Sequence, residues 1–298
     1  MITSTSVRVQ PYLRPGTDLH FSGGIWRAAV RRTSPGLDAN RHYFSHPVWL
    51  ESWLKEVHRY PELKARWLAA TGAWDDRVVV DLGCGPGNLF ALIGGRPKAL
   101  IGVDIATGSL ERAEKLGYTT IEADAQDTPL ASDMADIVAI NGTLHHCDDM
   151  AAVLREAARL VRPGGLIVVD HDPQRSAWNF RGLALWLWKL RLPLYKALDR
   201  GGHRAWDDEQ RWALATELHH KPGDGVSEEL FRQTLEPLGF QVDVYPHNNK
   251  VGGEVFEGVM ARPPLKIRLA QAMSGISSDA RQGAITLMCV ARKRPAAA

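Results

Sequence analysis

Short, uninterrupted apolar runs alternate with longer amphipathic stretches between residues 78 and 170. Runs of this kind predict strands that are buried on both faces, and the stretches between them predict crossover helices. Two further runs lie near the end of the sequence. The predicted strands are Val78–Val80, Ala99–Val103, Ile121–Ala125, Ala135–Ile140, Leu166–Asp170, Gln241–Tyr245 and Ala284–Ala291. The pattern therefore predicts an α/β fold with a doubly wound sheet of seven strands.

A glycine-rich loop, residues 81–88, follows the first of these strands. Glycines in a strand-to-helix turn permit positive φ and let a ligand approach the backbone closely. The third glycine, Gly87, comes one residue earlier than in the dinucleotide-binding spacing G-x-G-x-x-G, and Asn88 stands in its place. Asp81 would repel a pyrophosphate but suits a ligand that carries an ammonium group. The loop predicts a nucleotide-like cofactor with such a group.

From this loop onward, residues 75–172 resemble the class I S-adenosylmethionine-dependent methyltransferases of the small-molecule branch. The resemblance implies a Rossmann-like, mostly parallel sheet whose last strand is antiparallel. It also implies that Asp104 accepts from the ribose hydroxyls, that Asp124 takes the adenine amino group and that the backbone N–H of Ala125 meets the ring. The residues expected to hold S-adenosylmethionine are Asp81, Gly83, Cys84, Gly85, Gly87, Asn88, Asp104, Ile105, Asp124, Ala125 and Asn141.

The sequence outside the predicted core suggests covering elements. Residues 1–74 are expected to form an N-terminal arm and helical cap, with residues 1–40 extended and partly disordered. Residues 75–172 form the Rossmann-like core, 173–226 a helical, aromatic-rich lid, and 227–298 the rest of the core with an insertion at 246–283. None of the 10 tryptophans lies within 78–172. They either attach helices to the sheet or line an apolar pocket, and both interpretations remain open.

The composition of the chain limits the kinds of binding partner and the cellular location that are expected. With 36 basic and 34 acidic residues, the net charge of +2 gives no reason to expect nucleic acid. Three scattered cysteines, Cys84, Cys147 and Cys289, indicate a reducing cytoplasm rather than a disulfide framework. No apolar run is long enough for a signal peptide or a spanning helix. The cytoplasm is the expected location, and the oligomeric state is left open.

Residues 181–200 are apolar, rich in tryptophan and basic, and Pro193 predicts a break within them. We favour the interpretation that these residues form a lid helix that closes a hydrophobic cavity. Peripheral membrane contact through 181–200, with Lys189 and Arg191 reaching toward lipid headgroups, is the alternative.

Methyl transfer from a sulfonium is an in-line displacement, and only some acceptors need a base. The candidate catalytic residues are His145, His146 and His171. We favour a pocket-lining role for the first two, whereas His171 lies between two aspartates that are expected to raise its pKa and orient its ring. Metal binding by residues 145–149 is not expected, because consecutive side chains project in different directions.

The sequence thus predicts methyl transfer from S-adenosylmethionine to a hydrophobic or aromatic small molecule in secondary metabolism. Whether oxygen, nitrogen or carbon is methylated is left open. Two alternatives are a membrane-associated methyltransferase of quinones, isoprenoids or lipids, and a non-catalytic S-adenosylmethionine-binding protein. A dehydrogenase is the least favoured.

Overall fold

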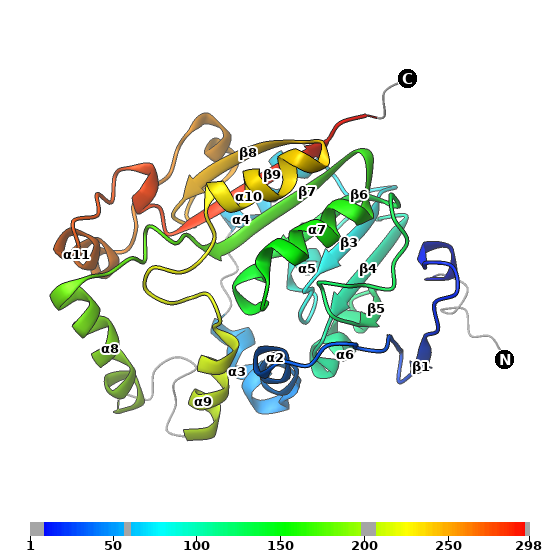
Figure 1. Ribbon diagram of the computed structural model, residues 1–298, viewed down its shortest axis with the longest axis horizontal. Coiled ribbons are helices and arrows are strands. Elements are labelled where there is room, and N and C mark those ends of the chain that lie inside the picture. The colour runs from blue at the N-terminus through cyan, green and yellow to red at the C-terminus, as the bar shows by residue number, and fades with distance from the viewer. Residues whose placement is uncertain (1–8, 57–60, 198–206, 296–298) are drawn as a thin grey trace.

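The computed structural model describes residues 9–56, 61–197 and 207–295 (Figure 1). Its centre is a nine-stranded sheet of order β1-β2-β5-β4-β3-β6-β7-β9-β8. The strands are β1 (His20–Ser22), β2 (Ile25–Arg27), β3 (Val78–Leu82), β4 (Ala99–Asp104), β5 (Thr119–Glu122), β6 (Ala135–Asn141), β7 (Val161–Pro173), β8 (Phe240–His247) and β9 (Thr286–Lys293). From β2 to β7 all pairings are parallel, and β9 is antiparallel to both β7 and β8. The mostly parallel sheet with an antiparallel last strand is confirmed.

The strand number is two higher than predicted, because β1 and β2 form a hairpin in the segment that was expected to be an extended, partly disordered arm. Gly23 and Gly24 make its turn with φ of 61° and 83°, and glycine pairs favour tight hairpin turns. The Phe21 and Trp26 rings pack 4.7 Å apart, and β2 pairs with β5. The hairpin thus covers an edge of the sheet that would otherwise be unpaired.

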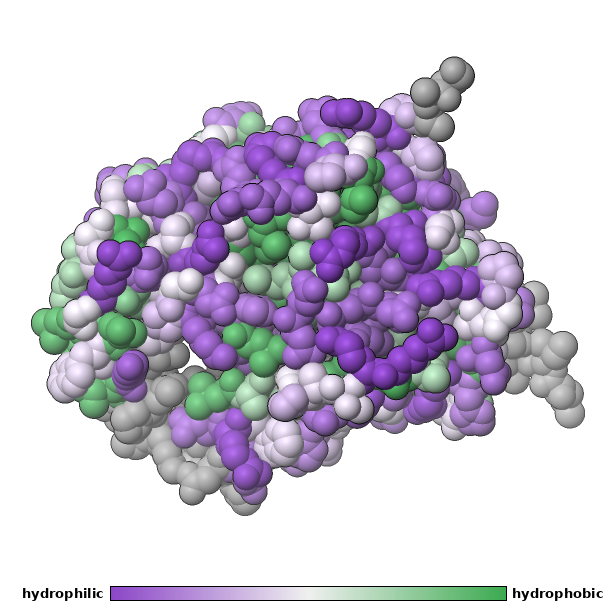
Figure 2. Space-filling view, viewed as in Figure 1, coloured by the Kyte–Doolittle hydropathy of each residue, from purple (hydrophilic) through white to green (hydrophobic). Residues whose placement is uncertain are grey.

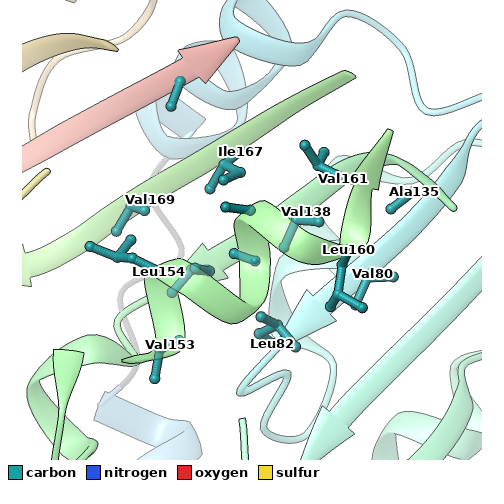
Figure 3. Close-up of a cluster of buried hydrophobic side chains, with 14 of the residues drawn as sticks. Val80, Leu82, Ala135, Val138, Val153, Leu154, Leu160, Val161, Ile167 and Val169 are labelled. Atoms are coloured by element: carbon teal, nitrogen blue, oxygen red, sulfur yellow. The ribbon is translucent and has the colours of Figure 1, made fainter. Parts of the chain in front are cut away.

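Helices cover both faces of the sheet (Figure 1). Helices α4 (Pro61–Thr71), α5 (Asn88–Ile93) and α6 (Thr107–Lys115) pack on one face, and α7 (Met150–Leu160) and α10 (Glu228–Leu235) on the other. Successive strand residues point to opposite faces. Val79 therefore lies in the hydrophobic core under α4, α5 and α6, whereas Val80 lies in the core under α7 and α10. Figure 3 shows Val153, Leu154 and Leu160 of α7 against valines of β3, β6 and β7.

The remaining helices lie around the carboxyl ends of the parallel strands. They are α2 (Pro35–Ser45), α3 (Pro47–Glu56), α8 (Gly182–Ala197), α9 (Asp207–Thr216) and α11 (Leu265–Met273). Short 3-10 turns occur elsewhere along the chain: η1 (Gln10–Tyr12), η2 (Leu144–His146), η3 (Glu236–Leu238), η4 (Gly253–Glu257) and η5 (Arg281–Gly283). α2 packs against α9, and α8 against α11. The predicted break at Pro193 is absent, because α8 continues through it. None of the helices in the described ranges is long and apolar enough to cross a membrane.

Candidate functional site

A cavity of about 1420 Å³ opens where β3, β4, β6 and β7 end. Ligands of open α/β sheets bind at this edge, because the strand-to-helix loops present backbone N–H groups there. Every residue that the sequence analysis assigned to cofactor or catalysis lines the cavity except Gly87. The cofactor candidates on its wall are Asp81, Gly83, Cys84, Gly85, Asn88, Asp104, Ile105, Asp124, Ala125 and Asn141, and His145, His146 and His171 lie there as well.

Glycine is needed at the three loop positions for different local reasons. At Gly83, with φ of 69°, an added Cβ would lie 2.2 Å from Cγ2 of Thr143. At Gly87, with φ of 84°, it would press on Leu116 and Tyr118, each 3.0 Å away. At Gly85, with φ of 51°, nothing lies within 4 Å. Gly83 and Gly87 therefore permit packing within the protein, whereas Gly85 leaves its space to the cavity.

Asp81 lies almost completely buried, and its Oδ2 accepts a 2.8 Å hydrogen bond from the Tyr118 hydroxyl. Burial raises the pKa of Asp81 to about 7, although the Tyr118 hydrogen bond lowers it, and the charge of Asp104 adds to the rise. A carboxylate with this pKa gains from a cationic neighbour near neutral pH.

Asp104, at the end of β4, organises the loop. Its Oδ2 accepts from the Gly85 N–H at 2.8 Å, and its Oδ1 accepts from the Ala106 N–H at 2.9 Å. Burial raises the pKa of Asp104, while these backbone hydrogen bonds lower it. Because each carboxylate oxygen can accept more than one hydrogen bond, the group retains the capacity to accept from ligand hydroxyls.

Two asparagines on the cavity wall test the fit of a polar cofactor. Nδ2 of Asn88 and Oδ1 of Asn141 are buried and have no hydrogen-bond partner among the described residues. Buried polar atoms of this kind are costly unless a ligand or water satisfies them. Together with Asp81, Asp104 and the open space at Gly85, they fit a ligand that carries an amino acid group, a sugar and a base.

Asp124 has a partner that the sequence did not predict. Arg32, 92 positions earlier, places Nη2 at 3.0 Å from Oδ2 of Asp124 and at 3.2 Å from Oδ2 of Asp148. Burial opposes ionisation of Arg32, yet the two carboxylates outweigh it and raise its pKa. Asp124, which the resemblance expects to contact adenine, is therefore engaged in an ion pair with Arg32.

His145 and His146 lie in η2 at the cavity wall. The Nδ1 atom of His145 lies 2.7 Å from Oδ1 of Asp172, and that of His146 lies 2.8 Å from the Thr216 carbonyl oxygen. Burial lowers the pKa of His145, but the hydrogen bond to Asp172 reverses the direction and raises it. For His146, burial and the neighbouring His145 lower the pKa to about 4.

His171 also faces the cavity, in a left-handed conformation with φ of 71°. Its flanking carboxylates, which were expected to orient its ring, also contact other side chains, and Oδ1 of Asp170 accepts a 2.7 Å hydrogen bond from the His171 backbone N–H. Asp170 binds Arg66 at 2.9 Å and His247 at 2.8 Å, and Asp172 binds His145.

The apolar walls come from the covering elements. They include Tyr43 and Phe44 of α2, Trp178 and Phe180 after β7, and Trp188 of α8. Both roles left open for the tryptophans occur, since Trp178 and Trp188 line the cavity, whereas Trp26, Trp67 and Trp74 are buried in the cores against the sheet. Glu217, directly after α9, also reaches the cavity and was missed, because no local signal marks it.

Comparison with known proteins adds to this geometry. A family model of a methyltransferase domain matches residues 80–169. Ubiquinone biosynthesis O-methyltransferase of Paracidovorax citrulli is 30% identical over 135 residues, which are 41% of this chain and 56% of that protein. Arsenite methyltransferase of Aquipseudomonas alcaligenes is 32% identical over 155 residues, 45% of this chain and 43% of that protein. The chain thus matches about half the length of these curated relatives.

Solved structures share the fold. A methyltransferase in complex with the Haloferax volcanii Trm112 methyltransferase activator has a TM-score of 0.52 at 17% identity, covering 87% of this chain and 99% of that chain. The plantazolicin methyltransferase BamL has a TM-score of 0.50 at 17% identity, covering 87% and 95%. The family match, the glycine loop and the order of the sheet identify residues 80–169 as a class I S-adenosylmethionine-dependent methyltransferase domain, whose cofactor is S-adenosylmethionine.

Proposed function

We propose that the protein transfers a methyl group from S-adenosylmethionine to a hydrophobic, ring-bearing small molecule. The observation that carries the proposal is one cavity of about 1420 Å³ that has the glycine loop on one wall and the aromatic side chains of Phe44, Phe180 and Trp188 on another. A pocket for one drug-sized ligand measures about 300–1,000 Å³. The larger volume accommodates a cofactor and an acceptor side by side.

On this proposal, Asp81 faces the ammonium group of the cofactor, Asp104 the ribose, and Asp124 with Ala125 the adenine. Asn88 and Asn141 offer their unpartnered polar atoms to the amino acid end. The bound cofactor supplies an electrophilic methyl group. The protein's own contribution is alignment of the two molecules and exclusion of water, which account for much of the acceleration in displacements of this kind.

The acceptor would lie between the cofactor and the lid. Phe44, Phe180 and Trp188 give this part of the cavity aromatic surface, and His145 with Asp172 gives it a polar end. An aromatic acceptor with one polar substituent matches both. A relative that is named for O-methylation in ubiquinone biosynthesis supports a ring-bearing acceptor.

The test is formation of S-adenosylhomocysteine with a panel of phenols, quinols and prenylated rings, measured by mass spectrometry. We expect turnover with an aromatic member of the panel. Trp188→Ala should raise the KM for this acceptor about tenfold, because apolar contact with the acceptor is lost, while the Kd of the cofactor stays unchanged. Trp186→Ala is the matched control, since Trp186 is 57% exposed on the same helix and does not line the cavity.

Calorimetric binding of S-adenosylmethionine with no product from any acceptor would instead favour a non-catalytic binding protein. Turnover with flexible, non-aromatic acceptors alone would contradict the aromatic assignment.

A membrane-associated acceptor is the second candidate, favoured by one surface. Large apolar side chains are exposed on α8 and α11, where Figure 2 shows hydrophobic residues gathered at one end of the molecule. They are Leu183, Trp186, Leu187 and Leu190 of α8, and Leu265, Leu269 and Met273 of α11. Lys189 and Lys266 are exposed on the same helices. An apolar face beside basic side chains suits an interface with anionic lipid.

Flotation with vesicles that contain anionic lipid tests this candidate. Trp186→Gln and Lys189→Glu should each reduce the bound fraction, whereas Leu238→Gln, which alters an exposed leucine outside this surface, should not. Absence of binding at low salt would exclude the membrane role.

A further inference from the structure

Two imidazoles and a carboxylate converge on one side of the cavity. One ligand atom from each of His145, His146 and Glu217 lies within 4.8 Å of the other two, and no other such group of three or more occurs among the described residues. Consecutive side chains were expected to diverge. Here the 3-10 turn brings the two histidine rings to 3.9 Å between centroids. Glu217 approaches from the end of α9, with Oε2 3.9 Å from Nε2 of His145.

The hydrogen bonds at the far side of each ring fix the tautomers. The Thr216 carbonyl oxygen only accepts, so Nδ1 of His146 carries the proton and donates it. Asp172, when ionised, likewise requires a proton on Nδ1 of His145. Each neutral ring then has its lone pair on Nε2. Metal-binding histidines characteristically donate their other N–H to a carboxylate or a backbone carbonyl.

The carboxylate is positioned in a similar way. Oε2 of Glu217 accepts from Nδ1 of His220 at 2.9 Å, and His220 packs against Trp178 with ring centroids 4.9 Å apart. Two histidines and one glutamate are a known ligand set of catalytic zinc sites, in which the fourth position stays open. Ligands about 2.1 Å from a tetrahedral ion stand about 3.4 Å apart, so binding requires the three groups to close by a small side-chain movement.

We propose that His145, His146 and Glu217 bind a divalent transition-metal ion, such as Zn²⁺, with a coordination position open toward the cavity. The extension to catalysis rests on the proposed function. An acceptor hydroxyl that reached the open position would lose its proton more easily, which narrows the acceptor class to phenols, enols and related oxygen ligands. The polar contact to the acceptor would then pass from His145 to the ion.

The experiment uses full-length protein without a histidine tag, stripped with a chelator and titrated with Zn²⁺ by calorimetry and with Co²⁺ by visible absorption. We expect one ion per chain and the absorption bands of Co²⁺ bound to nitrogen and oxygen ligands. Glu217→Gln and His146→Gln should each weaken Zn²⁺ binding at least tenfold, and Asp172→Asn by about 10–100-fold, because its role is to orient His145.

His219→Gln is the matched control, since His219 lies beside the cluster but pairs with Asp224 at 3.0 Å. Equal weakening by this control would overturn the proposal, as would the absence of stoichiometric binding to folded wild-type protein. If Glu217→Gln fails to fold, the wild-type Co²⁺ spectrum decides between binding and a plain hydrogen-bonded cluster. Because the probe is the metal alone, the outcome does not depend on whether a methyl acceptor is found.

Discussion

The hydroxyl of Tyr118 donates a hydrogen bond of 2.8 Å to Oδ2 of Asp81, and both side chains are almost fully buried beneath the glycine loop. The pair joins the end of β3 to the residue that precedes β5. Burial raises the pKa of Asp81 to about 7. The charge that the cofactor's ammonium group would meet is thus absent in part of the molecules near neutral pH.

This relationship predicts a pH-dependent cofactor affinity. As the pH rises from about 6 to 7.5, Asp81 loses its proton while the amino acid ammonium keeps most of its own, so binding of S-adenosylhomocysteine should strengthen by up to about tenfold per pH unit below the pKa. Calorimetry across this range measures the effect. Asp81→Asn should give weaker, pH-independent binding, and Tyr118→Phe should shift the profile to higher pH. If the cofactor affinity of wild type and of Asp81→Asn depended on pH in the same way, Asp81 would not be the group whose charge controls binding.

The same raised pKa affects the cofactor-free fold. Between about pH 4 and 7 the folded state keeps the proton of Asp81, whereas the unfolded chain releases it with a pKa near 3.9. The contribution of Asp81 to stability is therefore full at low pH and declines as the pH rises to about 7. The free energy of urea unfolding of wild type relative to Asp81→Asn should fall across this window, and a constant difference would count against the raised pKa.

Gly83 and Gly85 should respond differently to alanine. At Gly83 the new Cβ would meet the Thr143 side chain at 2.2 Å, so Gly83→Ala should unfold at clearly lower urea concentration than wild type. At Gly85 the Cβ would enter open cavity space, so Gly85→Ala should cost only about 1–2 kcal/mol of left-handed backbone strain. It should nevertheless weaken S-adenosylhomocysteine binding at least tenfold. Unchanged cofactor affinity in Gly85→Ala would remove the loop from the binding site.

Arg66, Asp170 and His247 form a fully buried ionic cluster under the site. Burial opposes ionisation of Asp170, but Arg66 and His247 outweigh it and hold its pKa well below its usual range. Arg66→Met leaves the buried carboxylate without its guanidinium partner, with only His247 and the His171 backbone N–H still bound to it, and should cost about 3–5 kcal/mol of unfolding free energy. The double variant Arg66→Met/Asp170→Asn should recover part of this loss, and a fully additive loss would argue against direct coupling.

Because the folded pKa of Asp170 is depressed, the stabilisation by this cluster is present above the unfolded pKa near 3.9 and is lost progressively as the pH falls below that value toward the folded pKa. The double variant, with a neutral amide at position 170, should show a weaker loss of unfolding free energy between pH 5 and 3. Equal acid sensitivity in both proteins would assign the effect to other carboxylates.

Local chemistry predicted most of the core. Buried parallel strands are continuous apolar runs, so the strands at Val78–Val80 and Ala135–Ile140 could be predicted from the sequence. The glycines after β3 indicated the edge of the sheet at which a ligand binds. The hairpin at Gly23 was overlooked although glycine pairs signal such turns. The partners of site residues were beyond local prediction. His145 meets Asp172 across 27 positions and His146 meets Thr216 across 70, and only the packing of η2, β7 and α9 brings them together.

The pair between Arg32 and Asp124 leads to the last prediction. Arg32 is 43% exposed on its side chain, and its bond to Oδ2 of Asp124 occupies an oxygen that is expected to accept from the adenine amino group. An exposed ion pair contributes about 0–1 kcal/mol, so the cofactor can displace Arg32 at a modest cost. Arg32→Ala should therefore bind S-adenosylhomocysteine with equal or up to about fivefold higher affinity, whereas Asp124→Ala should bind it at least tenfold more weakly. Arg14→Ala, which breaks the exposed pair with Asp127, is the control. Weaker binding in Arg32→Ala would show instead that the guanidinium contacts the cofactor, and would move Asp124 from binding the base to positioning Arg32.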